Sequence, residues 1–380
     1  MGALMNFSIQ GPASYRNWRA FLDRAPGRGA VFEVPIYSDA TVVGAISEGA
    51  GPYSILNGIP AGPTDAKLVL RFGVHLDPTE TRDMTSTDTA GYTGAHLGDE
   101  IAALLSLELG VRLMAGDSTR MEHGDGAPPV ILGDSRRPAM FLVPANKRSI
   151  VPRALTESRL KIDHLSTLPR LAPEDATALI RAARSYRDGM WIAEVEPELS
   201  WLLLISALEV ASTHQQIEQH DAVDILRRSK PKLVKRYENN PELLRDVANE
   251  LARELRATAR FLEFMNRHIP SPPTDRPPVE FQLSWPADLF DCMKTIYHHR
   301  SEALHEGIPF PPPMCLPPYE PSGWAAPSEK ILGLAAATMG GVWLKEEMPL
   351  SLHIFEYIAR NALLKWWSGL SIKERPQAPD

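Results

Sequence analysis

Cysteine is scarce in this sequence, and an excess of positive charge and long apolar runs are both lacking; each of these features excludes a class of protein. The 380 residues contain two cysteines, Cys292 and Cys315, too few for a disulfide framework or a zinc set, and they fit a reducing cytoplasm. The formal net charge of −7 excludes an overall basic coat for nucleic acid, although a local basic patch is compatible with it. The apolar runs at 201–211 and 331–344 are too short to span a bilayer, and no basic segment followed by an apolar one opens the chain. We therefore expect a soluble, cytoplasmic protein without a membrane partner.

Before residue 172 the sequence predicts a mixed α/β region with long loops, residues 1–170, whose role and protein partner the sequence does not reveal. Runs typical of β-strands occur at 29–37 ("GAVFEVPIY") and 67–76 ("KLVLRFGVHL"), and a further short strand is expected at 139–144. A helix is expected over 96–116, ending at a glycine. No phosphate-binding loop, nucleotide fingerprint or Ser-His-Asp set stands out in this region, and no cofactor is implied.

From residue 172 the pattern becomes helical, so we predict a mainly α fold with a helical domain over 172–380. Proline-rich segments at 270–278 and 308–323 must be loops because proline removes a backbone donor and clashes inside a helix. The small residues in 331–344 would suit close helix packing, either in a homodimer or in the core of one copy. Helices are expected at 172–195, 197–220, 221–229, 241–269, 286–307, 328–347 and 350–369.

The stretch "YHHRSEALHEG" (297–307) gathers three histidines, an arginine, a serine and two glutamates on one helix. His298, Ser301 or Glu302, and His305 share a face at helical spacing, and the long side chain of Arg300 could reach His305. An imidazole titrates near neutrality and a guanidinium suits phosphate, so the pair could move a proton beside a phosphate and neutralise developing charge. The alternative is a solvated helix end that complements the helix dipole.

The other charged residues of this stretch, and one charged residue upstream of it, each have more than one interpretation. His298, Glu302 and His305 share one side of the helix, so their spacing would allow them to bind a metal. His299 points to a different side, and we expect it to be a surface residue. A lone carboxylate in an apolar helix is costly, so Glu209 is expected to pair with a cation such as Arg300, in a structural or a supporting role. The spacing of Arg300 and His305 also occurs by chance in "RLKIDH" at 159–164, so the spacing alone has low specificity.

The same stretch resembles the signature of the HEPN superfamily, an arginine, a polar residue, three further positions and a histidine, with an aromatic residue before and a glycine after. Tyr297, Arg300, Ser301, His305 and Gly307 hold those positions, with one extra residue before the glycine. Upstream, "WLLLISALEVAS" resembles the helix that opens Apea-like HEPN domains, and "RFLEFMNRHIPSP" resembles the helix and proline turn in between. The resemblance covers about half of the chain and leaves the N-terminal region unexplained.

The resemblance implies a helical bundle that dimerises with two copies of the signature helix face to face. It further implies a metal-independent endoribonuclease in which the ribose 2′-OH attacks the adjacent phosphate and leaves a 2′,3′-cyclic phosphate. His305 would act as general base or acid, Arg300 would stabilise the transition state, and Ser301 would orient the histidine or bind phosphate. Supporting roles would fall to Tyr297, His298, Glu302 and Glu209. A toxin-like or defence effector would fit this reading, and a non-catalytic HEPN adaptor that binds RNA or mediates dimerisation is the alternative.

A basic run at 227–237, "RRSKPKLVKRY", could supply phosphate contacts to RNA in either case. The alternative is a solvated linker between helices. The cations concerned are Arg227, Arg228, Lys230, Lys232, Lys235 and Arg236.

Overall fold

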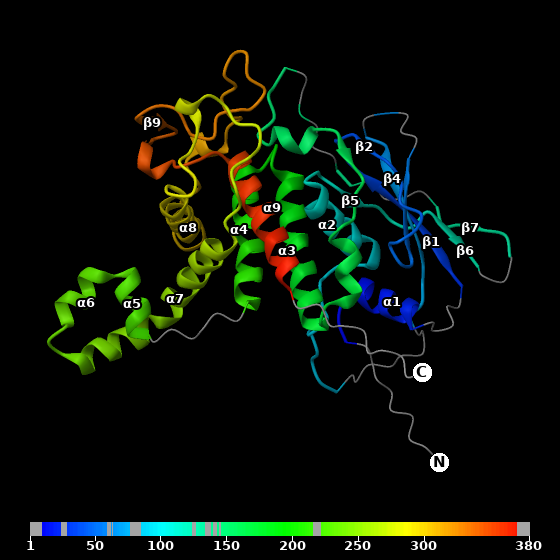
Figure 1. The fold of residues 1–380 in the computed structure, drawn as a ribbon, viewed down its shortest axis with the longest axis horizontal. Coiled ribbons are helices and arrows are strands. Elements are labelled where there is room, and N and C mark those ends of the chain that lie inside the picture. Colours follow the sequence, from blue (N-terminus) through cyan, green and yellow to red (C-terminus); the bar gives the residue numbers. More distant parts are fainter. Residues whose placement is uncertain are drawn as a thin grey trace. The chain divides into compact units, whose positions relative to one another are not determined.

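The computed structural model confirms a mixed N-terminal region followed by a mostly helical C-terminal half (Figure 1). The predicted strand at 139–144 lies mainly outside the described residues, and so do the side chains at 225, 228–229, 231 and 252–256. The structure describes residues 10–23, 29–58, 62, 64–76, 85–123, 127–133, 138–139, 143, 146–215 and 222–370.

The chain forms two compact units. The first holds the described residues up to Leu203 and from Trp366 onward, and the second runs from Leu204 to Lys365. The helices α4 (Pro197–His214) and α9 (Leu352–Gly369) contribute residues to both units. The boundary predicted at 170–172 precedes helix α3, whereas the two units divide within α4.

An antiparallel sheet forms the frame of the first unit. Its strand order is β3–β4–β1–β6–β7, and β5 also pairs with β1. Val34 and Ile36 of β1 lie opposite Leu70 and Leu68 of β4, and all four are buried because alternate residues of a strand point to the same face. The strands predicted at 29–37 and 67–76 are thereby confirmed. The strand bounds are β1 (Val31–Tyr37), β3 (Tyr53–Asn57), β4 (Ala66–Gly73), β5 (Met114–Ala115), β6 (Arg120–Glu122) and β7 (Val130–Ile131).

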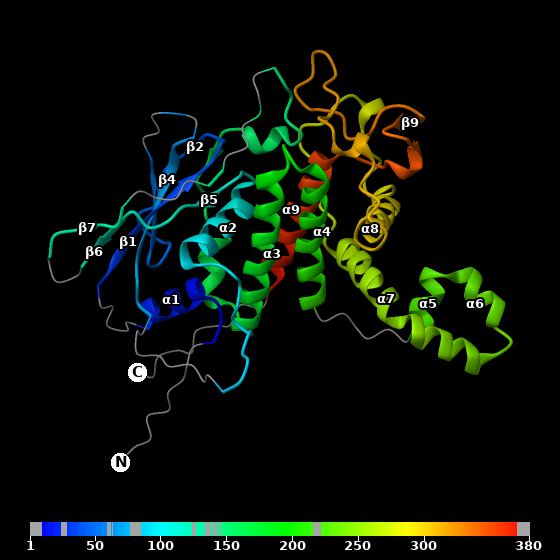
Figure 2. The same ribbon diagram turned by 180° about the vertical axis from the view of Figure 1, so that it is seen from behind.

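Three helices accompany the sheet: α1 (Ala13–Leu22), α2 (Leu97–Leu109) and α3 (Pro173–Ile192). Helix α2 lies between the sheet and α3, with Gly98 close against Val34 of β1 (Figure 2). Burial on both sides explains its run of apolar residues from Ile101 to Leu105. The helix predicted over 96–116 is too long, because Gly110 takes a left-handed φ of 72° and ends it. Strands β2 (Val42–Val43) and β8 (Ser158–Arg159) form a short parallel pair, and the 3₁₀ turns η1 (Pro152–Leu155) and η2 (Leu165–Arg170) precede α3.

A buried charge cluster ties the end of α3 to the sheet region. The guanidinium of Arg112 donates to Asp39 at 2.6 Å, to Glu194 at 2.5 Å and to the carbonyl of Met190 at 2.8 Å. Glu194 also accepts hydrogen bonds from the hydroxyl of Ser149 and the backbone amide of Ile150. Both carboxylates share the one guanidinium, and Oδ1 of Asp39 accepts no hydrogen bond from any described residue, so both carboxylates depend on Arg112 for a cation.

In the second unit, α7 (Pro241–His268) and α8 (Leu289–His305) accompany the adjoining parts of α4 and α9, which confirms the helices expected at 241–269, 286–307 and 350–369. The helix expected at 197–220 is confirmed as far as His214, and residues 216–220 lie outside the described part of the chain. Helices α5 (Ala222–Ser229) and α6 (Pro231–Tyr237) lie beside the beginning of α7 (Figure 1). They share a small core with α7 that consists of Ala222, Leu226, Leu244 and Ala248.

The proline-rich segments at 270–278 and 308–323 are loops with short 3₁₀ turns, as predicted. One such turn is η4 (Pro312–Cys315), and η3 (Val279–Phe281) follows the first segment. Arg276 binds the buried carboxylate of Glu329 through two nitrogens, at 2.6 and 2.8 Å, and so fastens the first loop to the segment that follows the second.

The helix predicted over 328–347 is wrong. Residues 335–344 form a β-hairpin, β9 (Ala335–Thr338) and β10 (Gly341–Leu344), followed by the 3₁₀ turn η5 (Lys345–Glu347). Met339 and Gly340 both take positive φ, 50° and 83°, the combination that closes a two-residue hairpin turn. The small residues of 331–344 therefore cannot pack as a helix face.

Candidate functional site

The carboxylate of Glu209 on α4 joins two residues of α8. One oxygen accepts a hydrogen bond from the hydroxyl of Tyr297 at 2.8 Å, and the other accepts from the guanidinium of Arg300, also at 2.8 Å. The ion pair expected from the lone carboxylate in an apolar helix is confirmed. Arg300 and Glu209 are both partly exposed, so the cluster opens to solvent on one side.

Tyr297 anchors this cluster in the interior. Its ring packs against Phe261 of α7 at a centroid distance of 4.7 Å, and Arg300 lies over the same ring at 5.5 Å. Burial, together with the negative charge of Glu209 and its hydrogen bond, raises the pKa of the Tyr297 hydroxyl above its ordinary value. Tyr297 is therefore a permanent hydrogen-bond donor that fixes the carboxylate, not a proton-transfer group.

His305 is the last residue of α8, and Gly307, with a φ of 69°, ends the helix beyond it as predicted. Five positions on a helix correspond to a rotation of about 140°, and the structure records no contact between Arg300 and His305 among the described residues. The imidazole of His305 is exposed and has no hydrogen-bond partner in the described part of the chain. Ser301 is half-buried, and its hydroxyl also makes no hydrogen bond with any described residue.

Glu302 lies between two histidines. One of its oxygens is 3.5 Å from Nε2 of the exposed His298, and the other is 3.2 Å from Nδ1 of His299. Nε2 of His299 also lies 2.7 Å from the carbonyl oxygen of Glu347. The expectation that His299 is a surface residue is wrong: its ring is buried and holds α8 to the segment that follows the hairpin.

The alternative metal site, His298 with Glu302 and His305, is not assembled. His298 and Glu302 are in contact, but His305 joins neither of them. Within the described ranges, no three His, Cys, Asp or Glu side chains are grouped as a metal ion would require.

Helix α6 carries the basic run on one side. Leu233, Val234 and Tyr237 pack on the small core shared with α5 and α7, which leaves the opposite side of the helix for cations. Lys232, Lys235 and Arg236, at spacings of three and four, are exposed and make no ion pair with a described residue. Lys230 is likewise exposed, whereas Arg227 pairs with Asp224 and the side chain of Arg228 lies outside the description. We call Lys232, Lys235 and Arg236 the basic face of α6.

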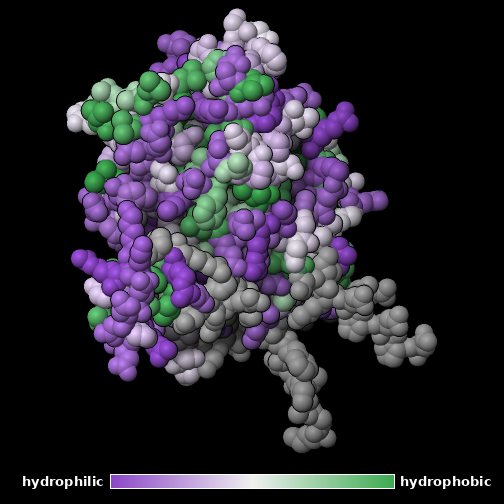
Figure 3. Space-filling view, turned by 60° about the vertical axis from the view of Figure 1, so that its left-hand side comes forward, coloured by the Kyte–Doolittle hydropathy of each residue, from purple (hydrophilic) through white to green (hydrophobic). Residues whose placement is uncertain are grey.

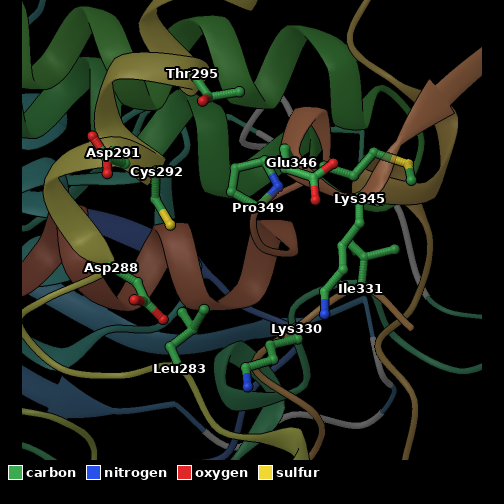
Figure 4. Close-up of a pocket in the computed structure, with 11 residues that line it drawn as sticks. Leu283, Asp288, Asp291, Cys292, Thr295, Lys330, Ile331, Lys345, Glu346 and Pro349 are labelled. Carbon is green, nitrogen blue, oxygen red and sulfur yellow. The ribbon is translucent and has the colours of Figure 1, made fainter. Parts of the chain in front are cut away.

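A pocket of about 360 Å³ lies beside the first turns of α8 (Figure 4). Charges of both signs line it, and most of them are exposed, so water screens them. Burial and the nearby carboxylates of Asp288 and Asp291 raise the pKa of the Cys292 thiol to about 12. Cys292 therefore lines the pocket as a neutral thiol and is not a nucleophile. The sequence did not predict the pocket, because Lys330 and Lys345 reach it only when the segment between them forms a hairpin. The charged lining residues are Asp288, Asp291, Lys330, Lys345 and Glu346.

No family model, curated protein or solved structure matches this chain. Among the described residues, no helix combines the length and apolar content needed to cross a membrane. The surface drawn in Figure 3 mixes polar side chains with separate groups of apolar ones.

Proposed function

We propose that this chain is a metal-independent endoribonuclease of HEPN type that acts in the cytoplasm as a homodimer, in a toxin-like or defence setting. The observation that carries the proposal is the arrangement on α8, where Glu209 fixes Arg300 at a solvent-open position and His305 remains an exposed, unengaged imidazole. A fixed guanidinium can stabilise the charge that develops on the phosphate, and a free imidazole can remove the proton from a ribose hydroxyl, both without a metal ion.

In the proposed reaction the imidazole of His305 removes the proton from the ribose 2′-OH. The 2′-oxygen then forms a bond to phosphorus while the bond from phosphorus to the 5′-oxygen breaks. The leaving 5′-oxygen takes a proton from a second acid, and a cyclic 2′,3′-phosphate remains. Because the other two histidines of α8 contact Glu302, His305 of a second copy is the acid that this proposal assigns.

The geometry also supports a second function. Glu209 offsets part of the charge of Arg300, and the two reacting side chains are separate within one copy. Both facts suit an adaptor that binds RNA through the basic face of α6 without cleaving it. The two functions differ in one measurement, the cleavage of bound RNA.

The direct test incubates the full chain with a panel of end-labelled single-stranded and hairpin RNAs in the presence of EDTA. We expect cleavage that is unchanged by EDTA and leaves 2′,3′-cyclic phosphate ends. RNA retention without cleavage would favour the adaptor. Failure to bind or to cleave any RNA in the panel would contradict both functions.

We expect the triple substitution of the basic face, Lys232→Ala with Lys235→Ala and Arg236→Ala, to weaken RNA binding and its dependence on salt. Each phosphate contact to a single strand contributes a slope of about 0.7 in log affinity against log salt, so losing three contacts should lower the slope by about 2. Fluorescence anisotropy over a salt series measures both quantities.

A matched triple replaces exposed cations of the first unit, Lys147, Arg159 and Arg170, and should leave the slope unchanged. If both triple variants lost the same amount of RNA affinity and of salt slope, the basic face would contribute only through the general charge of the chain.

A further inference from the structure

The pocket beside the first turns of α8 combines an apolar base with a charged rim. The base consists of the lining residues that are buried, Leu283, Cys292 and Met348. The volume of about 360 Å³ lies in the range of pockets that hold small molecules. Covering an apolar base removes it from water, so the pocket suits a ligand with an apolar part.

The charges on the rim do not neutralise one another directly. Two lysines and three carboxylates line the pocket, and none of the five makes an ion pair with a described residue. Arg276 and Glu329 of the same unit, by contrast, pair at 2.6 Å. Figure 4 shows Asp288 and Asp291 on one side of the pocket and Lys345 on the other. Opposite charges held apart around one cavity favour a ligand that itself carries both signs.

The backbone around the pocket is fixed by hydrogen bonds before a ligand arrives. The amide of Lys345 donates to the carbonyl of Leu334 at 3.0 Å. Nε2 of His299 lies 2.7 Å from the carbonyl oxygen of Glu347, which ties α8 to the turn that carries Lys345. Because the fold already holds both sides in place, binding does not have to order the backbone.

The kinds of charge on the rim narrow the class of ligand. Two ammonium groups beside three carboxylates leave a small net charge, so neither a nucleotide nor a polycation meets a field of the opposite sign. Aromatic rings recognise quaternary ammonium groups, and none of the residues that line this pocket is aromatic. A primary ammonium donates to carboxylates, and a ligand carboxylate accepts from lysines. A zwitterion that carries both groups and an apolar part fits this lining.

We infer that this pocket binds a zwitterion of the size of a dipeptide. The ammonium group of the ligand lies at Asp288 and Asp291, and its carboxylate lies at Lys330 and Lys345. A round cavity of this volume is about 9 Å across, and two residues of extended chain span about 7 Å. A single α-amino acid carries both charged groups on one carbon and is too short to reach both sides. The ligand also displaces the water that otherwise screens these charges, which strengthens its contacts with them.

The inference adds a binding function that does not depend on RNA cleavage. The rise of about 1.5 Å per residue places Cys292 about 20 Å from His305 along the axis of α8. A dipeptide in the pocket therefore does not reach the proposed catalytic end of the helix. Binding can be measured without RNA, so the failure of one proposal leaves the other standing.

Isothermal titration calorimetry of the full chain with glycyl-leucine tests the inference. N-acetyl-glycyl-leucine lacks the ammonium group, and glycyl-leucinamide lacks the carboxylate. We expect glycyl-leucine to bind and each blocked analogue to bind about 10-fold more weakly, because each loses the charge-assisted hydrogen bonds at one end. A blocked analogue that bound as tightly as glycyl-leucine would overturn the inference, and so would the absence of glycyl-leucine binding at millimolar concentration.

Two substitutions assign each end of the ligand to its side of the pocket. Lys345→Met should weaken glycyl-leucine binding by about 10-fold and leave the affinity for glycyl-leucinamide unchanged, because that analogue has no carboxylate to lose a partner. Asp291→Asn should weaken glycyl-leucine binding to a similar extent and leave the affinity for the N-acetyl analogue unchanged. Both side chains are exposed, so neither change should disturb the fold.

Matched controls remove exposed charges of the same unit outside the pocket. Lys294→Met and Asp275→Asn should leave the affinity for glycyl-leucine unchanged. If the controls weakened binding as much as Lys345→Met and Asp291→Asn, the general charge of the chain would be the cause and the inference would be wrong. Wild-type affinity in both pocket variants would place the ligand elsewhere and would also overturn it.

Discussion

We expect His305→Ala to lower the rate of RNA cleavage by about 10²–10⁴-fold, the usual contribution of a general acid or base. The substitution should not unfold the chain, because the side chain is exposed at the end of α8 and makes no hydrogen bond or ion pair with a described residue. Single-turnover cleavage of an end-labelled RNA measures the rate, and thermal unfolding monitors the fold. His123→Ala removes another exposed histidine, in the first unit, and is the matched control.

Arg300 should be nearly as important for the rate, for a different reason. Arg300→Ala removes the charge that would stabilise the transition state, a loss of about 10²–10³-fold, and it also leaves Glu209 without its cation. Arg300→Lys should rescue only part of the rate, because an ammonium lacks the fork that binds two phosphate oxygens. Arg159→Ala, at the exposed arginine of the chance match, should leave cleavage unchanged.

Cleavage that survives both His305→Ala and Arg300→Ala would exclude this site as its source. A variant that binds RNA with unchanged affinity but no longer cleaves it would separate a catalytic role from a binding one. The pH profiles of the wild type and of His305→Ala add a third readout, since removal of a proton-transfer group changes the shape of the profile.

Local patterns predicted those parts of the fold in which burial follows the sequence directly. Alternating apolar residues identified β1 and β4, because one face of each strand is covered. The lone Glu209 in an apolar helix predicted its pairing with Arg300, because an unpaired charge is costly there. Gly307 predicted the end of α8, because a positive φ favours glycine.

The parts that the sequence did not predict depend on contacts between distant segments. A short apolar run fits a strand or a helix equally well by periodicity, and the hairpin at 335–344 was misread for that reason. The overlooked signal was the pair Gly340–Gly341, which permits a tight turn after Met339. The burial of His299 was missed in turn, because its partner Glu347 follows the hairpin.

The largest effect on stability is expected from Arg112→Ala. The side chain of Arg112 is 2% exposed, and its partners Asp39 and Glu194 are 8% and 6% exposed. Removing the guanidinium leaves two buried carboxylates without a cation, which typically costs about 3–5 kcal/mol of the free energy of unfolding. Urea unfolding of the full chain, followed by tryptophan fluorescence, should show a much lower midpoint.

Arg71→Ala provides the comparison that isolates burial as the cause. Arg71 also pairs with two carboxylates, Glu122 at 2.6 Å and Glu33 at 3.9 Å, but it is 39% exposed. Water already solvates that cluster, so its loss should cost less than about 1 kcal/mol. If the two substitutions shifted the unfolding midpoint equally, Glu194 would have to be held by Ser149 and Ile150 alone, and Arg112 would be a replaceable partner. Combining Arg112→Met with Asp39→Asn should recover part of the lost free energy of unfolding, because only one buried carboxylate is then left without a cation.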